Sequence, residues 1–215
     1  ERYNIGVAVC DRWAEQDPDR LALLDVDVTG VVDRVTFGDL RTRSNRLANF
    51  IIKSGIQRGE RIAILLPQSR DVAESHIAIY KAGAVALPLA VLFGVDALTY
   101  RLQDAGITGL ITNSAGLQKL KSATEPLPHF KFVLSVDGDE GAAKDFNSAL
   151  AAERDHFMPV DTRADDPALM IYTSGTTGQP KGALHGHRVL PGHLPGFELV
   201  HEFFPRDDDL LWTPA

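Results

Sequence analysis

A short polar loop carries the clearest chemistry in this sequence of 215 residues. The ten residues from Thr173 to Gly182 include four hydroxyl side chains, three glycines and the lysine Lys181. Glycines let backbone N–H groups turn toward a ligand without a Cβ in the way. Hydroxyl groups donate hydrogen bonds to anionic oxygens, and the lysine adds a mobile positive charge. This combination suits a polyphosphate better than it suits an ordinary Gly/Ser/Thr-rich surface turn.

The spacing within the loop differs from that of the commoner phosphate-binding and nucleophile motifs. A Walker A motif has Gly-Lys-Ser/Thr four residues after its first glycine. Here Gly175 is followed five positions later by Pro180, and Lys181 is followed by Gly182. The dinucleotide pattern GxGxxG and the nucleophile pattern GxSxG are also absent. The sequence therefore favours Ser174 as a ligand-binding hydroxyl over Ser174 as a nucleophile.

The segments on either side of the loop decide where its polar groups point. The apolar run 168–171 before the loop predicts a strand, and a helix is expected to begin near His187. A strand–loop–helix arrangement would bring backbone N–H groups and a helix N-terminus close to a bound anion. We expect this arrangement to support phosphate binding.

Apolar strands that alternate with helices are expected through the rest of the chain. The continuous apolar run 61–66 is typical of a strand buried on both faces. Thr36 and Asp39 form a predicted capping box at the start of a helix. The pattern predicts an α/β fold with a mostly parallel sheet flanked by helices. The expected elements are helices at 7–16, 71–82, 95–105 and 117–123, a hairpin within 21–36, strands at 84–89, 109–112, 130–136 and 210–213, and a surface excursion over 137–166 with a short helix at 147–153.

Composition and charge narrow the class of protein. The net charge of −7 argues against a nucleic-acid partner, because phosphate contacts require clusters of basic residues. The single cysteine, Cys10, excludes an internal disulfide, fits a reducing compartment and is expected to be a buried thiol. No apolar run approaches the roughly 20 residues of a membrane span. The cytoplasm is therefore the expected location.

Two motifs make this sequence resemble the adenylate-forming superfamily of acyl-CoA synthetases, nonribosomal-peptide adenylation domains and luciferases. From Tyr172 to Gly182 the loop matches the signature Tyr-Thr-Ser-Gly-Thr-Thr-Gly-x-Pro-Lys-Gly at every fixed position. Upstream, the run from Lys81 to Pro88 resembles the motif Lys-Ala-Gly-x-x-x-x-Pro of the same superfamily. Segments 58–67 and 100–106 are similar to acyl-CoA synthetases, and 91–94 followed by 96–101 resembles the acetyl- and medium-chain types most.

The resemblance implies an AMP-forming acid–CoA ligase that uses a carboxylic acid, ATP with Mg²⁺, and coenzyme A. Its loop would bind and stabilise the pyrophosphate that leaves when the carboxylate attacks the α-phosphate. His187 matches a histidine that lies toward the acyl pocket in such enzymes, so a role beside substrate or nucleotide stands open against a packing role. The residues implied to surround the β- and γ-phosphates are Thr173, Ser174, Gly175, Thr176, Thr177, Gly178 and Lys181.

Several other conspicuous side chains are expected to be structural. Lys81 is expected to be structural or solvated, Tyr172 to be a core aromatic, and Gly182 to allow close packing behind the loop. Trp212 and the pair 203–204 are expected in the core. Four histidines lie within seventeen residues, but no cysteine or carboxylate completes a convincing metal site with them. These are His185, His187, His193 and His201.

The resemblance covers only the N-terminal part of such an enzyme. Residues 1–215 are expected to be part of the large AMP-binding domain, and the groups implied for adenine, ribose and magnesium would lie downstream. No catalytic residue is therefore expected within this chain. Two alternatives remain: an adenylation enzyme with a carrier-protein acceptor, and a noncatalytic nucleotide-binding module. A sheet cut after 210–213 is also expected to self-associate through its edge and uncovered apolar face.

Overall fold

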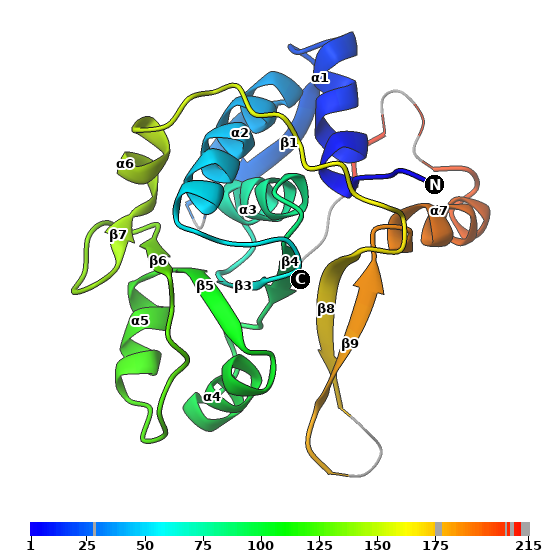
Figure 1. Cartoon of the computed structure of the whole chain (residues 1–215). Coiled ribbons are helices and arrows are strands. Elements are labelled where there is room, and N and C mark those ends of the chain that lie inside the picture. The colour runs from blue at the N-terminus through cyan, green and yellow to red at the C-terminus, as the bar shows by residue number, and fades with distance from the viewer. Residues whose placement is uncertain (28, 175–177, 205, 207–208, 212–215) are drawn as a thin grey trace.

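A mostly parallel sheet forms the centre of the computed structural model, which describes residues 1–27, 29–174, 178–204, 206 and 209–211 (Figure 1). The strand order in this part of the chain is β7–β6–β5–β3–β4–β8–β9. Neighbouring strands are parallel except for the antiparallel pair β8–β9. The predicted α/β class is confirmed. The strands are β3 (Arg61–Leu65), β4 (Val85–Pro88), β5 (Ile107–Thr112), β6 (Phe132–Ser135), β7 (Lys144–Asp145), β8 (Pro167–Thr173) and β9 (Lys181–Gly186).

Helices cover both faces of the sheet, which explains the continuous apolar run in β3. Side chains alternate between the two faces of a strand, so Ile62 and Ile64 join one core cluster while Ala63 and Leu65 join the other. Helices α2, α3 and α6 contribute to the first cluster, and α4 and α5 contribute to the second. Their bounds are α2 (Phe37–Lys53), α3 (Arg70–Lys81), α4 (Val95–Asp104), α5 (Ser114–Lys121) and α6 (Phe146–Ala151).

The N-terminal elements follow the sequence prediction closely. Residues 7–16 are helical, wound first as η1 (Val7–Asp11) and then as α1 (Arg12–Gln16). The antiparallel hairpin β1 (Leu21–Val26) and β2 (Val32–Thr36) forms a separate two-stranded sheet. The predicted capping box opens α2: the Thr36 hydroxyl accepts from the Asp39 N–H at 3.1 Å, and the Asp39 carboxylate accepts from the Thr36 N–H at 3.0 Å.

Residues 137–166 form the predicted surface excursion, with β7 and α6 as its short regular elements. After α6 the chain runs back over α2 toward the N-terminal segment (Figure 1). Two asparagines of α2 tie it down, since the Asn45 side-chain amide donates to the Asp155 carbonyl at 2.9 Å and that of Asn49 donates to the His156 carbonyl at 3.0 Å. This excursion leads the chain to the start of β8.

The segment after the polar loop differs from the prediction. Strand β9 follows the loop and pairs with β8, so the loop joins two strands of a hairpin rather than a strand and a helix. The predicted helix exists as α7 (Val189–Val200), but it begins at the opposite end of the hairpin from the loop (Figure 1). The expectation of a helix N-terminus beside the bound anion is therefore wrong. A turn at residues 187–188 separates β9 from α7, and the strand before it was missed because residues 181–186 lack a strand-like alternation.

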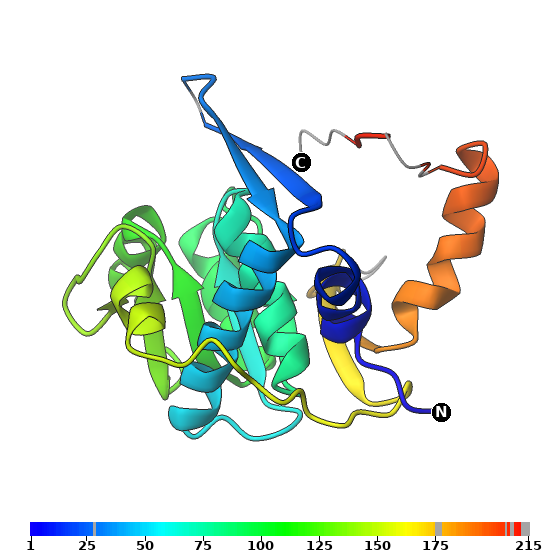
Figure 2. The same ribbon diagram turned by 90° about the horizontal axis from the view of Figure 1, so that it is seen from above.

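The C-terminal segment also departs from expectation. Helix α7 stands away from the sheet when the molecule is seen from above (Figure 2), and none of its described residues is buried. Phe203 is 70% exposed, so its predicted place in the core is wrong in this chain. Leu210 and Leu211 are not in a strand, and the rest of the predicted strand 210–213, with Trp212, lies outside the described residues.

Candidate functional site

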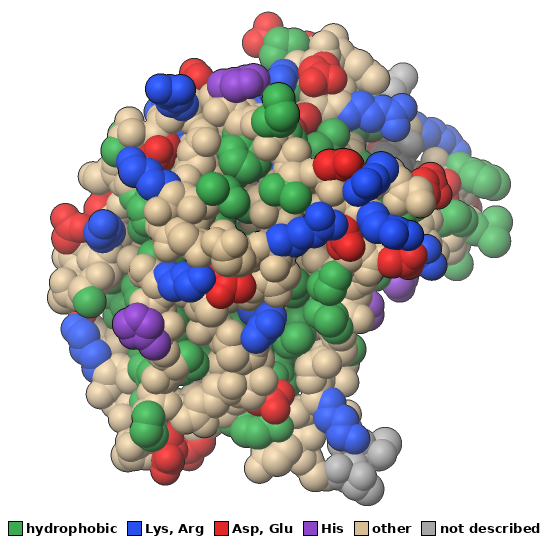
Figure 3. Space-filling model, in the orientation of Figure 1, with side chains coloured by type: hydrophobic (Ala, Val, Ile, Leu, Met, Phe, Trp, Pro, Cys, Tyr) green, Lys and Arg blue, Asp and Glu red, His purple; other side chains and the backbone are tan. Residues whose placement is uncertain are grey.

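The polar loop sits at the end of the β8–β9 hairpin. The last paired residues are Thr173 and Lys181, so 174–180 form the loop itself. Thr173, Ser174, Gly178 and Lys181 are all exposed there. The predicted site residues Gly175, Thr176 and Thr177 lie outside the described residues. Figure 3 shows the end of the hairpin protruding from the body of the molecule, with basic side chain on it.

Two glycines shape the hairpin end in different ways. Gly178 has φ +97°, a conformation that residues with a Cβ rarely adopt. Gly182 has an ordinary φ but no free space, because a Cβ there would lie 3.0 Å from Met170 Sδ and 3.2 Å from Tyr172 Cζ. The close packing predicted at Gly182 is therefore confirmed, and the two side chains that pack over it come from β8.

Lys181 is free to meet an anionic ligand. Its side chain is exposed, and within the described part of the chain its ammonium group forms no ion pair. A lysine ammonium is a compact charge with three donors on a flexible stem, which suits phosphate oxygens. Within the described residues no helix begins at this end of the hairpin, so Lys181 is the positively charged group that the structure places there.

Helix α4 contacts the end of β8 and the last residue of the loop before β9. The Tyr172 hydroxyl donates a short hydrogen bond to the Asp104 carboxylate, and the Tyr100 hydroxyl donates to the Pro180 carbonyl at 3.1 Å. Burial, and secondarily the Asp104 carboxylate, raises the pKa of Tyr172. Tyr172 packs on the core as predicted, but its hydroxyl contact was missed. The 91–106 segment signalled a family likeness and gave no sign that α4 would face the loop.

His187 lies at the far end of the hairpin from the loop. Its ring is fully buried, its Nδ1 accepts from the Ile5 N–H at 3.2 Å, and it packs edge-on against Tyr80 at 6.1 Å. Burial lowers the pKa of His187 to about 4, with the Asp166 carboxylate opposing that shift and the Arg58 guanidinium adding to it. Its Nε2 is buried without a hydrogen-bond partner among the described residues. This placement favours the packing alternative over a place beside the phosphates.

Lys81, from the second motif, is a structural residue, as predicted. It is fully buried, and its Nζ lies 2.5 Å from Asp11 Oδ1, 2.9 Å from Ser44 Oγ and 2.8 Å from Asn45 Oδ1. Burial lowers the pKa of Lys81, and the nearby Asp11 and Cys10 oppose that shift. The predicted buried thiol is also confirmed, since Cys10 is fully buried and burial raises its pKa to about 11.

The part of the chain that the structure describes contains no group of three or more His, Cys, Asp or Glu residues arranged to hold a metal ion. The histidines of the C-terminal region accordingly have separate surroundings, with His185 on β9, His187 in the core and His193 exposed on α7. Among the same residues, no helix is both long enough and apolar enough to cross a membrane.

A family model described as AMP-binding enzyme matches residues 10–214. The chain belongs to the AMP-binding enzyme family. The signature loop of this AMP-binding chain is thus found in the fold that its sequence implied. Structural similarity agrees: an acyl-CoA synthetase from Brucella canis superposes with a TM-score of 0.88 at 28% identity, covering 100% of this chain and 38% of that one.

Two acetyl-coenzyme A synthetases and a second solved structure are also similar to this chain. An acetyl-coenzyme A synthetase from Magnetococcus marinus is 29% identical over 233 residues, and one from Halorhodospira halophila is 30% identical over 231 residues. ATP-bound MatB from Rhodopseudomonas palustris has a TM-score of 0.77 at 26% identity and covers 96% of this AMP-binding chain. The chain spans about 36% of the length of the Magnetococcus relative and 35% of the Halorhodospira one.

Proposed function

We propose that this chain is the N-terminal part of an AMP-forming acid–CoA ligase. The enzyme would convert a carboxylic acid, MgATP and coenzyme A into an acyl-CoA, AMP and pyrophosphate. The observation that carries the proposal is the complete signature loop, set on a hairpin end where Lys181 is exposed, in a chain that resembles acyl-CoA synthetases throughout its length.

The chemistry requires a group that binds the leaving pyrophosphate. A carboxylate oxygen attacks the α-phosphorus of ATP, and the bond from that phosphorus to the bridging oxygen of pyrophosphate breaks. Negative charge then grows on the β- and γ-phosphates. The loop hydroxyls, its N–H groups and the Lys181 ammonium would stabilise that charge as it develops. In the second half-reaction the thiol of coenzyme A displaces AMP from the acyl-adenylate.

The phosphate loop supplies only part of this active site. The residues proposed to contact the phosphates are Thr173, Ser174, Gly175, Thr176, Thr177, Gly178 and Lys181. Among the described residues, none with a carboxylate lies on the loop itself, so Mg²⁺ is proposed to enter as part of MgATP. We expect the remaining contacts to come from the part of the relatives' length that this chain does not span, and residues 1–215 alone to form no acyl-adenylate.

The test is carboxylate-dependent exchange of pyrophosphate into ATP by the full-length protein, with acetate, medium-chain and aromatic acids. Exchange with one class of acid would establish adenylation and name the substrate class. We expect Lys181→Ala to lower kcat/KM for exchange by about 100-fold, the typical cost of removing one donor to a developing anion. Lys144→Ala is the matched control, because Lys144 is an exposed lysine at the opposite edge of the sheet.

Two other outcomes of this experiment would redirect the proposal. Exchange without transfer to coenzyme A, but with transfer to a carrier-protein thiol, would favour the other class of adenylation enzyme. MgATP binding that is weakened by Lys181→Ala, with no exchange for any acid, would favour a noncatalytic nucleotide-binding module. Two observations favour this second function: the described loop residues are exposed, and the chain spans only 36% of the length of the Magnetococcus relative.

The chain is also proposed to self-associate when produced by itself. Apolar side chains on and after α7 are exposed, and green side chains gather there at the right of Figure 3. The edge strand β9 adds unpaired backbone groups to this region. Light scattering of the 215-residue chain should therefore give a mass above 23.4 kDa. A monodisperse monomer would contradict this.

We further propose a cytoplasmic location, which the buried, unpaired thiol of Cys10 supports.

A further inference from the structure

The outer half of the β8–β9 hairpin extends beyond the rest of the sheet. Strand β8 pairs with β4 only at Ala86 and Leu169, near its beginning. From Met170 to Thr173 its strand partner is β9, which is itself the edge of the sheet in the described part of the chain. A two-stranded hairpin is marginally stable by itself, so the position of the loop depends on other contacts.

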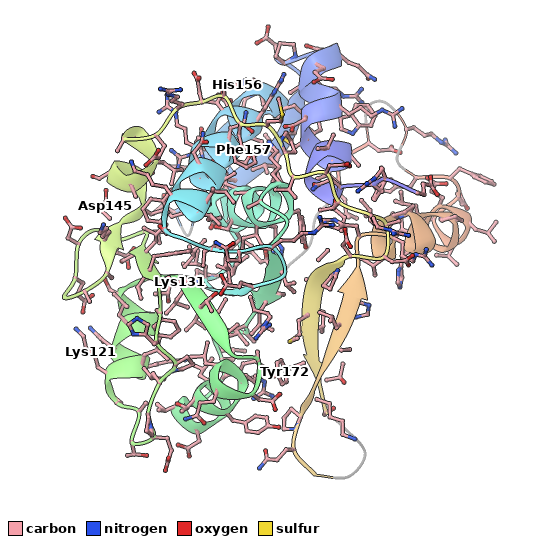
Figure 4. The ribbon with its side chains drawn as sticks, in the orientation of Figure 1. Lys121, Lys131, Asp145, His156, Phe157 and Tyr172 are labelled. Atoms are coloured by element: carbon pink, nitrogen blue, oxygen red, sulfur yellow. The ribbon has the colours of Figure 1, made fainter. Side chains whose placement is uncertain are left out.

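Helix α4 provides these contacts on both sides of the loop. On one side of the loop, Tyr172 lies two residues before Ser174, and its hydroxyl donates to the Asp104 carboxylate. On the other side, Pro180 directly precedes Lys181, and its carbonyl accepts from the Tyr100 hydroxyl. Residues 100 and 104 are one helical turn apart, so both contacts leave the same face of α4. Figure 4 shows Tyr172 between the hairpin and α4.

Arg101 adds a third contact that fixes the ring of Tyr172. The Arg101 guanidinium carbon lies 5.6 Å from the centroid of the Tyr172 ring and 4.1 Å from that of Phe93. The side chain is buried, and its Nη1 donates to the Ala97 carbonyl at 2.7 Å. Such a cation held between two aromatic rings restricts how far either ring can move.

The position of the Tyr172 ring is transmitted across the hairpin. Tyr172 is the cross-strand partner of Gly182, and its Cζ would lie 3.2 Å from a Cβ at that position. The ring therefore packs directly on the backbone of Gly182, the residue after Lys181. A shift of the ring would move the base of the loop and the backbone that carries the Lys181 ammonium.

We propose that Tyr100, Arg101 and Asp104 of α4, together with Tyr172, are positioning residues that set the phosphate loop for MgATP. We call these four residues the α4 anchor. The inference rests on the proposed function of the loop. The four residues would act through their contacts with Pro180 and Gly182, the two neighbours of Lys181, and not by binding the phosphates themselves. Because a misplacement of about 1 Å can cost a reacting group much of its effect, the anchor matters for nucleotide binding and turnover.

The test measures how the full-length protein binds and uses MgATP. Binding gives an equilibrium Kd, and pyrophosphate exchange gives KM and kcat. Tyr172→Phe and Tyr100→Phe each remove one hydroxyl and keep the ring. Each should raise the Kd and KM for MgATP by about 5-fold, the order of magnitude of the net contribution of one hydrogen bond. The KM for the carboxylic acid should stay within about twofold. Tyr3→Phe is the matched control, since the Tyr3 hydroxyl makes no hydrogen bond within the described part of the chain.

Two substitutions of Asp104 distinguish a role in positioning the loop from a role in folding. Asp104→Asn keeps an acceptor for the Tyr172 hydroxyl and should preserve MgATP affinity, whereas Asp104→Leu should match Tyr172→Phe. The double variant Tyr172→Phe/Asp104→Leu should be no worse than either single change, because both remove the same contact. Thermal midpoints measured in parallel identify any variant that weakens binding by unfolding.

The outcomes distinguish this inference from the proposed function. If the wild-type protein binds MgATP but exchanges with no acid, the ligase proposal fails, and the Kd series still tests the anchor. If the tyrosine variants bind MgATP as the wild type and Tyr3→Phe do, the anchor has no positioning role. If the wild-type protein does not bind MgATP, the loop is not a nucleotide site and the anchor proposal falls with it.

Discussion

Lys81 and Lys181 both belong to family motifs, but the fold gives them opposite surroundings. Lys81 is fully buried at the end of α3, with Asp11, Ser44 and Asn45 around its ammonium group. Lys181 is exposed at the end of β9, with no ion pair in the described part of the chain. An ammonium group has three donors: those of Lys81 face its three buried partners, whereas those of Lys181 have no partner among the described residues.

The comparison shows how one residue type stabilises the fold in one motif and stays exposed to solvent in the other, where we propose that it binds phosphate. A buried charge must be paired, and once paired it fixes the elements that supply its partners. The partners of Lys81 come from the N-terminal helix and from α2, so it joins three helices. An exposed lysine contributes little to folding, and its charge remains available. Substitutions should therefore separate the two lysines by stability and by activity.

The largest predicted effect on stability is at Lys81. Lys81→Met would leave the buried Asp11 carboxylate without its cation, and breaking such a pair typically costs about 3–5 kcal/mol. Lys181→Met should change the free energy of unfolding by less than about 0.5 kcal/mol, as at other surface positions. Urea denaturation followed by Trp13 fluorescence would measure both, because Trp13 lies in α1 and stacks on Phe37 at the start of α2.

The double variant Lys81→Met/Asp11→Asn sharpens this prediction. Removing both charges should recover part of the stability that Lys81→Met loses, because the unpaired carboxylate accounts for much of the cost. Equal losses for Lys81→Met and Lys181→Met would contradict the distinction between the two lysines.

Two histidines, the fully buried His187 and the half-buried His76, extend the comparison to pH. Burial lowers the pKa values of His76 and His187 to about 4 in the folded protein. The unfolded chain therefore binds more protons than the folded protein between about pH 6.5 and pH 4. This stability is present above pH 6.5 and is lost as the pH falls toward 4. Each histidine should cost roughly 1–2 kcal/mol at pH 5, measured by urea denaturation at a series of pH values.

Variants of single histidines would show which residue causes the change of the free energy of unfolding with pH. His187→Asn replaces the Nδ1 acceptor for the Ile5 N–H with Oδ1 and removes the titrating group, so part of the slope should disappear. His193→Asn, on the exposed side of α7, provides the solvent-facing comparison. An unchanged slope in His187→Asn would show that His187 does not stay neutral in the folded protein over this range.

Smaller losses of stability than at Lys81 are expected for two glycines of the same hairpin. Gly182→Ala places a Cβ 3.0 Å from Met170 Sδ, and the flexible methionine can move, so a loss of about 1 kcal/mol is expected. Gly178→Ala meets nothing within 4 Å but must adopt φ +97°. Its cost of roughly 1–2 kcal/mol arises from the backbone and should be confined to the loop. Hydrogen exchange would show faster exchange of β9 amides in Gly182→Ala alone.

Much of the central sheet could be predicted from sequence, because local patterns carry the information. The apolar run of β3, the capping box of Thr36 and Asp39, and the helix over 7–16 each depend on residues close together in the chain. The hairpin strand β9 was missed, since Lys181–Gly186 mixes small, polar and apolar residues without a strand-like alternation. Its partner β8 makes it a strand, and that pairing is a tertiary fact.

The sequence by itself determined the family, the α/β class and the presence of the signature loop, because these depend on which residues follow one another. Only the tertiary structure decided which lysine is buried, that α7 begins at the wrong end of the hairpin to help bind a phosphate, and that α4 contacts both sides of the loop. The physical reason is that burial and hydrogen bonding join residues far apart in the chain, as Tyr100 and Pro180 or Asp11 and Lys81 are, and no local pattern records which of them will meet.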